Sequence, residues 1–144
     1  MKASIILSCV IGLAATAAFA QADVIKARQE AMKATGAKTA VVGKMLKGED
    51  KFDIEKVKAA LNQYVMVSEK GPAMFPAGSQ NGDTAALPAV WTDRAEFEKA
   101  FAKLGADAKA ALGKITDEAS AKATFPEVLK DCGGCHEKFR AKKS

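Results

Sequence analysis

The chain has 144 residues and carries 22 basic and 17 acidic side chains, a formal net charge of +5. This length fits one domain, and the small basic excess is spread along the chain instead of forming the dense stripe that nucleic-acid binding uses. We therefore expect no nucleic-acid partner, although a mild positive charge can steer an anionic protein partner.

The first 20 residues have the pattern of a cleavable secretory signal peptide. Lys2 precedes an apolar run that begins at Ile5, and small residues lead to an Ala-Phe-Ala cleavage site at 18–20. The run is too short to span a membrane, and a lipid anchor on Cys9 is the weaker alternative because cleavage there would leave only a stub. We expect one periplasmic domain at 21–144, without stable membrane insertion. Removing 20 residues from 144 leaves 124, and losing Lys2 lowers the net charge to +4.

Two helices are predicted next, at residues 23–47 and 53–69. In each, apolar or semi-polar side chains recur at intervals of three and four, the spacing of one helix face. Gly48 would end the first helix, and Asp53 is available as the amino-terminal cap of the second. The first stripe consists of Ile25, Met32, Thr35, Thr39, Val42 and Leu46, with Arg28 in the remaining place, and the second of Ile54, Val57, Leu61, Val65 and Ser68.

Residues 70–88 are rich in glycine and proline and have no periodicity, which predicts one long loop. A third helix follows Thr92 or Asp93, and a last helix covers about 118–141. Pro126 should kink the last helix or mark a restart at Thr124, with Glu127 completing a capping box. Four amphipathic helices without an alternating strand pattern predict an all-α, antiparallel up-down four-helix bundle. The third stripe consists of Phe97, Phe101, Leu104, Ala108 and Leu112.

The last helix carries Cys132, Gly133, Gly134, Cys135 and His136 in succession. This spacing is the haem-attachment signature, in which two thiols add to the vinyl groups of the haem and the adjacent imidazole binds its iron. One helical turn separates the two sulfurs on the side of the histidine, so one segment can fix the ring and its metal. The glycines would let the porphyrin lie close to the backbone.

Three other interpretations of these cysteines compete with a covalent haem. A thioredoxin-like pair needs a strand-helix setting in an α/β domain. Structural zinc needs four nitrogen or sulfur ligands, whereas the chain after residue 20 offers two thiols and one histidine. A simple disulfide accounts for Cys132 and Cys135 but leaves His136 without a role. The motif favours one covalent haem c.

The methionines are the candidates for the sixth iron ligand. In an up-down bundle the start of the first helix lies beside the end of the fourth, and at about 1.5 Å per residue Met32 and His136 differ in height by only a few Å. Met45 lies roughly 20 Å further along the same helix and is expected to fill core or surface. Met66 points away from its helix's apolar face, and Met74 lies in the loop. Met32 is therefore the predicted ligand, although a helical methionine is by default core packing.

Three polar residues are candidates for contacts with the haem. Arg28 lies one turn before Met32, where a buried guanidinium needs an anionic partner such as a haem propionate, unless it reaches water from the end of the bundle. Gln29 either joins the same propionate network or faces solvent. Arg140 either covers the proximal side of the ring or complements the carboxyl end of its helix.

The chain resembles class II c-type cytochromes, the cytochrome c-prime family. The resemblance spans residues 21–144 and includes Arg28 with Gln29, residues 88–91, Pro126, the 132–136 motif, and Phe139 with Arg140. Family members with leucine or a similar residue at the place of Met32 are five-coordinate and bind nitric oxide or carbon monoxide. A methionine there resembles the low-spin branch, similar to cytochrome c-556, where it is the sixth iron ligand. The resemblance also implies propionate contacts at Arg28 and the possibility of a homodimer through the first two helices.

Two functions follow from these expectations. The first is electron transfer, with His136 and Met32 holding the iron and a redox partner protein docking at a haem edge near Lys138, Lys142 and Lys143. The second is a gas-binding module for nitric oxide, in which Met32 is displaced or does not coordinate. An enzyme is not expected, because we find no further histidine and no nucleophile-base pair.

Overall fold

The computed structural model describes residues 10–142. Residues 1–9 of the expected signal peptide, including Cys9, and Lys143 with Ser144 lie outside them. All regular elements of the described chain are helices, and none of these helices is long and apolar enough to cross a membrane. The elements are α1 (Val10–Leu46), α2 (Ile54–Lys70), the 3₁₀ turn η1 (Pro72–Met74), α3 (Ala89–Thr92), α4 (Arg94–Lys114) and α5 (Glu118–Phe139).

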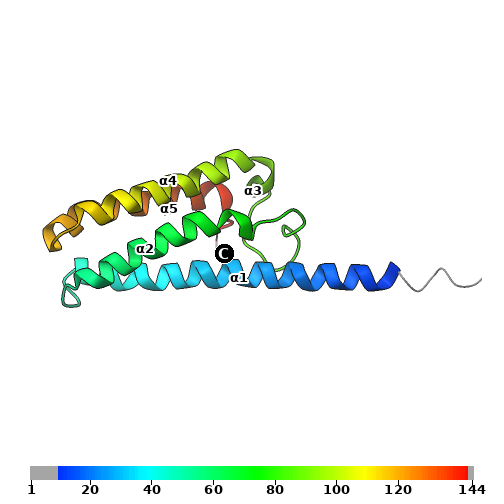
Figure 1. The fold of residues 1–144 in the computed structure, drawn as a ribbon, viewed down its shortest axis with the longest axis horizontal. Helices are drawn as coiled ribbons and strands as arrows, with labels where there is room; N and C mark the ends of the chain where they lie inside the picture. Colours follow the sequence, from blue (N-terminus) through cyan, green and yellow to red (C-terminus); the bar gives the residue numbers. More distant parts are fainter. Residues whose placement is uncertain (1–9, 143–144) are drawn as a thin grey trace, which may run out of the picture.

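The four long helices α1, α2, α4 and α5 run alternately in opposite directions, which confirms the predicted up-down bundle (Figure 1). Helix α2 packs against α1 on one side and α4 on the other, and α4 also packs on α5. Helices α1 and α5 touch one another only slightly. The bundle therefore opens between its first and last helices, and the haem-attachment motif lies on one wall of this opening.

Helix α1 begins earlier than predicted, at Val10 instead of residue 23. The segment before 23 is rich in alanine, the residue with the highest helix propensity, and contains no proline to end a helix. Its amino-terminal part extends past the other helices (Figure 1), and from residue 22 onward, where burial is described, Ile25 is the first buried residue. The end is as predicted, because Gly48 has a positive φ of 77° just after Leu46.

The predicted capping of α2 is confirmed. The Asp53 carboxylate accepts hydrogen bonds from the backbone N–H groups of Glu55 and Lys56, which stabilises a helix by about 1 kcal/mol. Helix α4 begins after Asp93, also as predicted, but the Asp93 side chain makes no capping hydrogen bond. It pairs instead with Lys138 of α5 at 3.0 Å. The single-turn helix α3 before it was not predicted.

Of the two effects predicted for Pro126, a kink in the last helix or a restart of that helix at Thr124, the restart is wrong. Helix α5 is continuous from Glu118 through Pro126, and its capping box is formed by Asp117 and Ser120. The Ser120 N–H donates to the Asp117 carboxylate at 2.8 Å, and the Asp117 N–H donates to the Ser120 hydroxyl at 3.0 Å. Phe125, which is fully buried directly before the proline, provides packing that offsets the backbone hydrogen bond a proline cannot make.

The core is most completely filled at the end of the bundle where α1 meets α2 and α4 meets α5. Tyr64 and Phe125 pack there with ring centroids 5.9 Å apart. Gly105 of α4 lies so close to α2 that a Cβ on it would clash with Ser68 Oγ. The other fully or almost fully buried side chains of this end are Val42, Met45, Val57, Ala60, Leu61, Ala108, Ala111, Ile115 and Ala121.

Candidate functional site

The motif occupies the last turns of α5. Cys132, Cys135 and His136 are half-buried, and the two cysteines do not form a disulfide. Gly133 and Gly134 are exposed, and a Cβ on either would meet no atom within 4 Å. Packing within the described residues therefore does not require glycine at these two positions, so it gives no support to the hypothesis that they bring a porphyrin close to the backbone.

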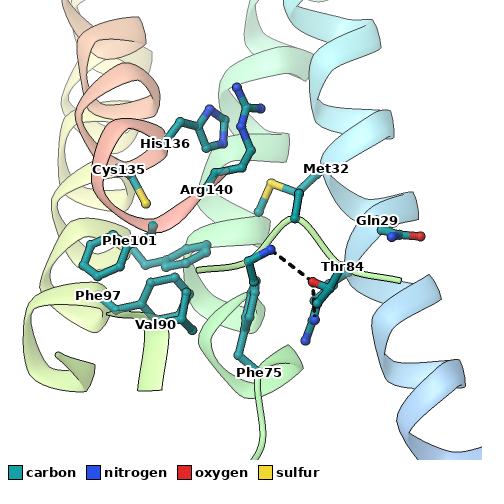
Figure 2. A pocket seen from close by; sticks show the side chains of 14 residues that line it. Gln29, Met32, Phe75, Thr84, Val90, Phe97, Phe101, Cys135, His136 and Arg140 are labelled. Atoms are coloured by element: carbon teal, nitrogen blue, oxygen red, sulfur yellow. Dashed lines mark hydrogen bonds between the residues drawn. The ribbon is translucent and has the colours of Figure 1, made fainter. Parts of the chain in front are cut away.

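Two adjoining cavities lie against this turn, with volumes of about 560 and 160 Å³. Five residues line both cavities and so form their common wall: Met32, Phe101, Cys135, His136 and Arg140. The larger cavity continues between α1 and α5 past Thr35, Gly36, Thr39, Ala40, Leu129, Asp131 and Cys132. The smaller one extends toward the loop past Arg28, Gln29, Phe75, Thr84, Val90, Phe97 and Phe139 (Figure 2). Their combined volume lies in the range of sites that bind cofactors.

The structure separates the four methionines of residues 22–142 as predicted. Met32 lies on α1, opposite the α5 turn that carries His136, and its side chain points toward the cavity (Figure 2). Met45 is 1% exposed and belongs to the filled core, whereas Met66 is 40% exposed. Met74 ends the η1 turn. Of these four, Met32 alone lines the cavities described above.

Burial sets the protonation of the site. Desolvation, with a smaller contribution from the charge of Arg140, lowers the pKa of His136 below its usual value, and so keeps the imidazole neutral, the form that binds a metal. Desolvation also raises the pKa of the Cys132 and Cys135 thiols. The thiols are therefore held protonated in the folded chain.

Four phenylalanines surround one side of the cavities. Phe97 is at the centre, with ring centroids 4.9 Å from Phe75, 5.1 Å from Phe101 and 5.2 Å from Phe139, all edge to face. Such contacts are favourable beyond the area they bury. The helical stripes identify Phe97 and Phe101 as buried, but Phe75 comes from the loop, where no periodicity points to it.

The structure places the two candidate propionate contacts beside the smaller cavity. Arg28 is only 3% exposed, and its guanidinium donates to oxygen atoms of the 71–88 loop. It therefore does not reach water, the alternative raised by its position. Gln29 is exposed, and its Nε2 donates to the Asp83 carbonyl at 2.9 Å. Burial lowers the pKa of Arg28, but an arginine guanidinium stays charged in proteins.

Arg140, the third candidate, follows directly after α5. It is the carboxyl-terminal cap residue, and its backbone N–H donates to the His136 carbonyl at 3.2 Å. Its exposed side chain lines both cavities beside His136 (Figure 2). The position suits the predicted cover of the proximal side of a ring.

A chain of directed hydrogen bonds borders the larger cavity on α1. The Thr39 hydroxyl donates to the Thr35 carbonyl at 2.9 Å, so its single proton is used, and the Tyr64 hydroxyl must donate to Thr39 across 2.6 Å. Likewise Thr35 donates to the Ala31 carbonyl and accepts from Gln63. Desolvation raises the pKa of the buried Tyr64 to about 12. These bonds fix α2 to the α1 wall of the cavity.

Asp131, which sequence reasoning did not identify, is a buried carboxyl group at the edge of the larger cavity. Its side chain is 6% exposed, one of its oxygens pairs with Lys103 at 2.5 Å, and the other, Oδ2, has no hydrogen-bond partner. Desolvation raises its pKa, although Lys103 opposes the shift. Its position directly before Cys132 on α5 was the only signal in the sequence.

The donor set fits a covalent haem and no other group considered. One largely apolar space is lined by two thiols one turn apart, a neutral imidazole and a thioether. These are the groups that attach haem c and hold its iron. A bare metal ion is not supported, because residues 10–142 contain no group of three or more His, Cys, Asp or Glu arranged to bind one. The zinc interpretation therefore has no geometric support here.

Comparisons with known proteins agree with this fit. A family model described as "Cytochrome C'" matches residues 23–140. Cytochrome c' of Rhodopseudomonas palustris is 52% identical over 128 residues, which cover 88% of this chain and 88% of that protein. Cytochrome c-556 of Agrobacterium fabrum is 37% identical over 144 residues, 99% of this chain and 95% of that protein.

The fold comparison gives the same answer. The solved structure of cytochrome c' from Rhodopseudomonas palustris superimposes with a TM-score of 0.81 at 51% identity and covers 85% of this chain and 98% of that chain. The matched proteins thus include both the cytochrome c' and the cytochrome c-556 type, and proteins of this family carry covalent haem c.

Proposed function

Because this chain belongs to the cytochrome c' family, we propose that it transfers single electrons in the periplasm through one low-spin haem c held between α1 and α5. One observation carries the proposal: a thioether on α1 and an imidazole on α5, Met32 and His136, line the same two cavities from opposite helices. The bound haem would supply reversible one-electron chemistry at its iron.

Each residue of the site has a separate task in this proposal. Cys132 and Cys135 hold the porphyrin by thioether bonds, and His136 and Met32 bind the iron. Both iron ligands project from long helices whose other faces are packed, so neither has to move far when the oxidation state changes. The phenylalanines around Phe97 exclude water from the ring.

The polar candidates act at the edge of the site. Four of the five N–H groups of Arg28 already donate to the loop, so a propionate contact would use its Nε–H or its charge alone. Gln29 could supply a second donor to the same propionate only by releasing Asp83. Arg140 would cover the proximal side of the ring beside His136.

A redox partner protein would dock at the haem edge near the end of α5. Lys138, one of the predicted docking residues, forms ion pairs with Asp93 and Glu96, so its charge is partly neutralised, and Lys143 lies outside the described residues. A leader at residues 1–20 would carry the chain to the periplasm. Homodimer formation through α1 and α2 stays a prediction, for which Val41 and Met66 are the large apolar side chains exposed among residues 22–142.

An absorption spectrum tests the ligand assignment. The reduced protein should show the sharp α band of low-spin haem, and the ferric protein a methionine charge-transfer band that disappears in Met32→Leu. Met66→Leu is the matched control, because it makes the same substitution at an exposed position and should keep the band. A charge-transfer band that survives in Met32→Leu would exclude Met32 as the ligand.

Gas binding is the second candidate function, because the relative at 52% identity is a cytochrome c' and a small cavity adjoins Met32. In this alternative Met32 does not hold the iron, or leaves it when nitric oxide arrives. Carbon monoxide separates the two functions. Rapid and full conversion of the reduced protein at low gas concentration would favour the gas-binding function, whereas slow or incomplete conversion favours electron transfer.

A further inference from the structure

Residues 71–88, which we call the strap, connect α2 to α3 and have no regular structure beyond the η1 turn. Within the strap only a few carbonyl groups, those of Gly71, Pro72, Pro76 and Gly82, accept a hydrogen bond from its own backbone, and unpaired buried carbonyls are costly. Side chains from outside the strap also bind its carbonyl groups. Arg94 of α4 donates to the Pro72 and Phe75 carbonyls at 2.8 and 3.0 Å, and the Trp91 indole donates to Pro76 at 3.0 Å.

Arg28 holds the strap from the opposite side of the bundle. Its Nη1 donates to Ser79 Oγ at 3.0 Å and to the Met74 carbonyl at 3.4 Å. Its Nη2 donates to the Ser79 carbonyl at 2.8 Å and to Thr84 Oγ1 at 2.6 Å. The guanidinium also lies over the Phe75 ring, 4.6 Å from its centroid. One side chain of α1 thus binds three positions of the strap and packs on a fourth.

The strap forms part of the wall of the smaller cavity. Phe75, Thr84, Ala85 and Ala86 line it together with Met32, which lies one helical turn after Arg28. Thr84 Oγ1 accepts from Arg28 and also from the Ala86 N–H at 3.1 Å. A hydrogen bond of Arg28 therefore holds Thr84, and its guanidinium packs on Phe75, both of which line this cavity.

We propose that Arg28 is a positioning residue that acts through the strap: it holds residues 74–84 against α1 and so closes the Met32 side of the haem site to small molecules. The inference rests on the proposed haem site. This role differs from a propionate contact, because the partners of Arg28 are Ser79, Thr84 and Met74. Substituting the side chains of such partners does not alter a haem propionate, so the two roles can be tested separately.

The experiment removes the hydrogen bonds between Arg28 and the strap in the haem-loaded protein, once by changing Arg28 and once by changing its partners in the strap. Arg28→Lys keeps the positive charge but cannot make four hydrogen bonds, and the double variant Ser79→Ala with Thr84→Val removes two acceptors and keeps Arg28. Because a hydrogen bond to a charged group is typically strong enough that its loss changes an equilibrium by about tenfold, both variants should speed amide hydrogen exchange of Met74, Phe75, Ser79 and Ala86 by about that factor.

Carbon monoxide is the probe for closure. Its association rate with the reduced protein, measured after flash photolysis, should also rise by about tenfold in both variants. Arg140→Lys is the matched control, because Arg140 lines the same cavities while its side chain makes no hydrogen bond to the strap in the described residues. It should leave strap exchange at the wild-type rate.

If the double variant keeps wild-type exchange and wild-type carbon monoxide kinetics, Arg28 does not act through the strap, whatever Arg28→Lys does. Equal changes in Arg28→Lys and Arg140→Lys would also overturn the proposal, since they would point to a general effect of removing a guanidinium. The amide-exchange measurement does not need Met32 to ligate the iron. A failure of the low-spin assignment would therefore appear in the spectrum alone.

Discussion

The two ends of the bundle solve different packing problems. At the end with Tyr64 and Phe125, side chains from α1, α2, α4 and α5 fill the interior without a cofactor. At the other end α1 and α5 are separated by the two cavities, and the phenylalanines around Phe97 pack along one side of the space. The side chains alone therefore form a complete core at one end of the bundle. At the other end the core is completed only when a haem fills the cavities.

The largest expected effect comes from removing the attachment chemistry. In Cys132→Ala with Cys135→Ala no thioether bond can form, so intact-mass measurement of the secreted protein should give the mass of the bare polypeptide. Hydrogen exchange should rise at the cavity end and stay slow around Phe125. Cys9→Ala is the control and should leave the mature mass unchanged, because the expected cleavage after Ala20 would remove that residue. Equal loss of protection at both ends would contradict the division.

A truncation at the filled end should cost more stability than one at the cavity end. Phe125 is fully buried, so Phe125→Ala should lower the free energy of unfolding by about 3–5 kcal/mol. Phe75 is half-buried in the strap, and Phe75→Ala should cost less. Denaturant unfolding of both variants checks the order, and a larger cost for Phe75→Ala would show that the cavity end is the better-packed part.

The raised pKa of Tyr64 predicts that the protein loses stability at alkaline pH. Burial raises its pKa in the folded state to about 12, from the ordinary value of 10.0. The neutral phenol is therefore favoured by folding, the stabilisation is complete below pH 10, and it is lost as the pH rises toward 12. Two pKa units correspond to about 2.7 kcal/mol.

The free energy of unfolding measured from pH 9 to pH 12 gives this loss. Tyr64→Phe provides the reference, because it keeps the ring and removes the titrating group. The wild-type stability should fall relative to that of the variant over this range. Parallel curves for the two proteins would contradict the assignment of the alkaline loss to Tyr64.

The smallest effects come from two helical glycines. A Cβ at Gly105 would lie 3.0 Å from the Ser68 Cβ and closer to its hydroxyl, so Gly105→Ala should force α2 and α4 apart and cost about 1–3 kcal/mol. A Cβ at Gly43 meets no atom within 4 Å, and Gly43→Ala should stabilise α1 by up to about 1 kcal/mol. Thermal unfolding should show shifts of opposite sign.

Much of the fold follows from local rules that the sequence displays. The helical stripes predicted the four long helices and most of the buried residues, because burial of one helix face requires that spacing. The attachment motif predicted where Cys132, Cys135 and His136 meet, and the height argument brought Met32 to the same cavities. Met45 and Met66 were correctly separated from it by distance and direction.

The remainder depends on contacts between distant segments. The strap has no periodicity, so neither the position of Phe75 nor the partners of Arg28 could be predicted from it. The restart at Thr124 was wrong because the tertiary packing of Phe125 keeps α5 helical through Pro126. Asp131 lies in a helix with ordinary spacing, and only the folded chain shows that one of its oxygens has no partner.

The strap also fixes the position of the segment that follows α5. The Leu87 N–H donates to the Phe139 carbonyl and the Ala141 N–H to the Ala85 carbonyl, at 3.0 and 2.8 Å, so residues 139–141 are fixed beside the attachment turn. A protein immobilised on an electrode through a tether attached at Ala141 would therefore be oriented with this turn facing the conducting surface.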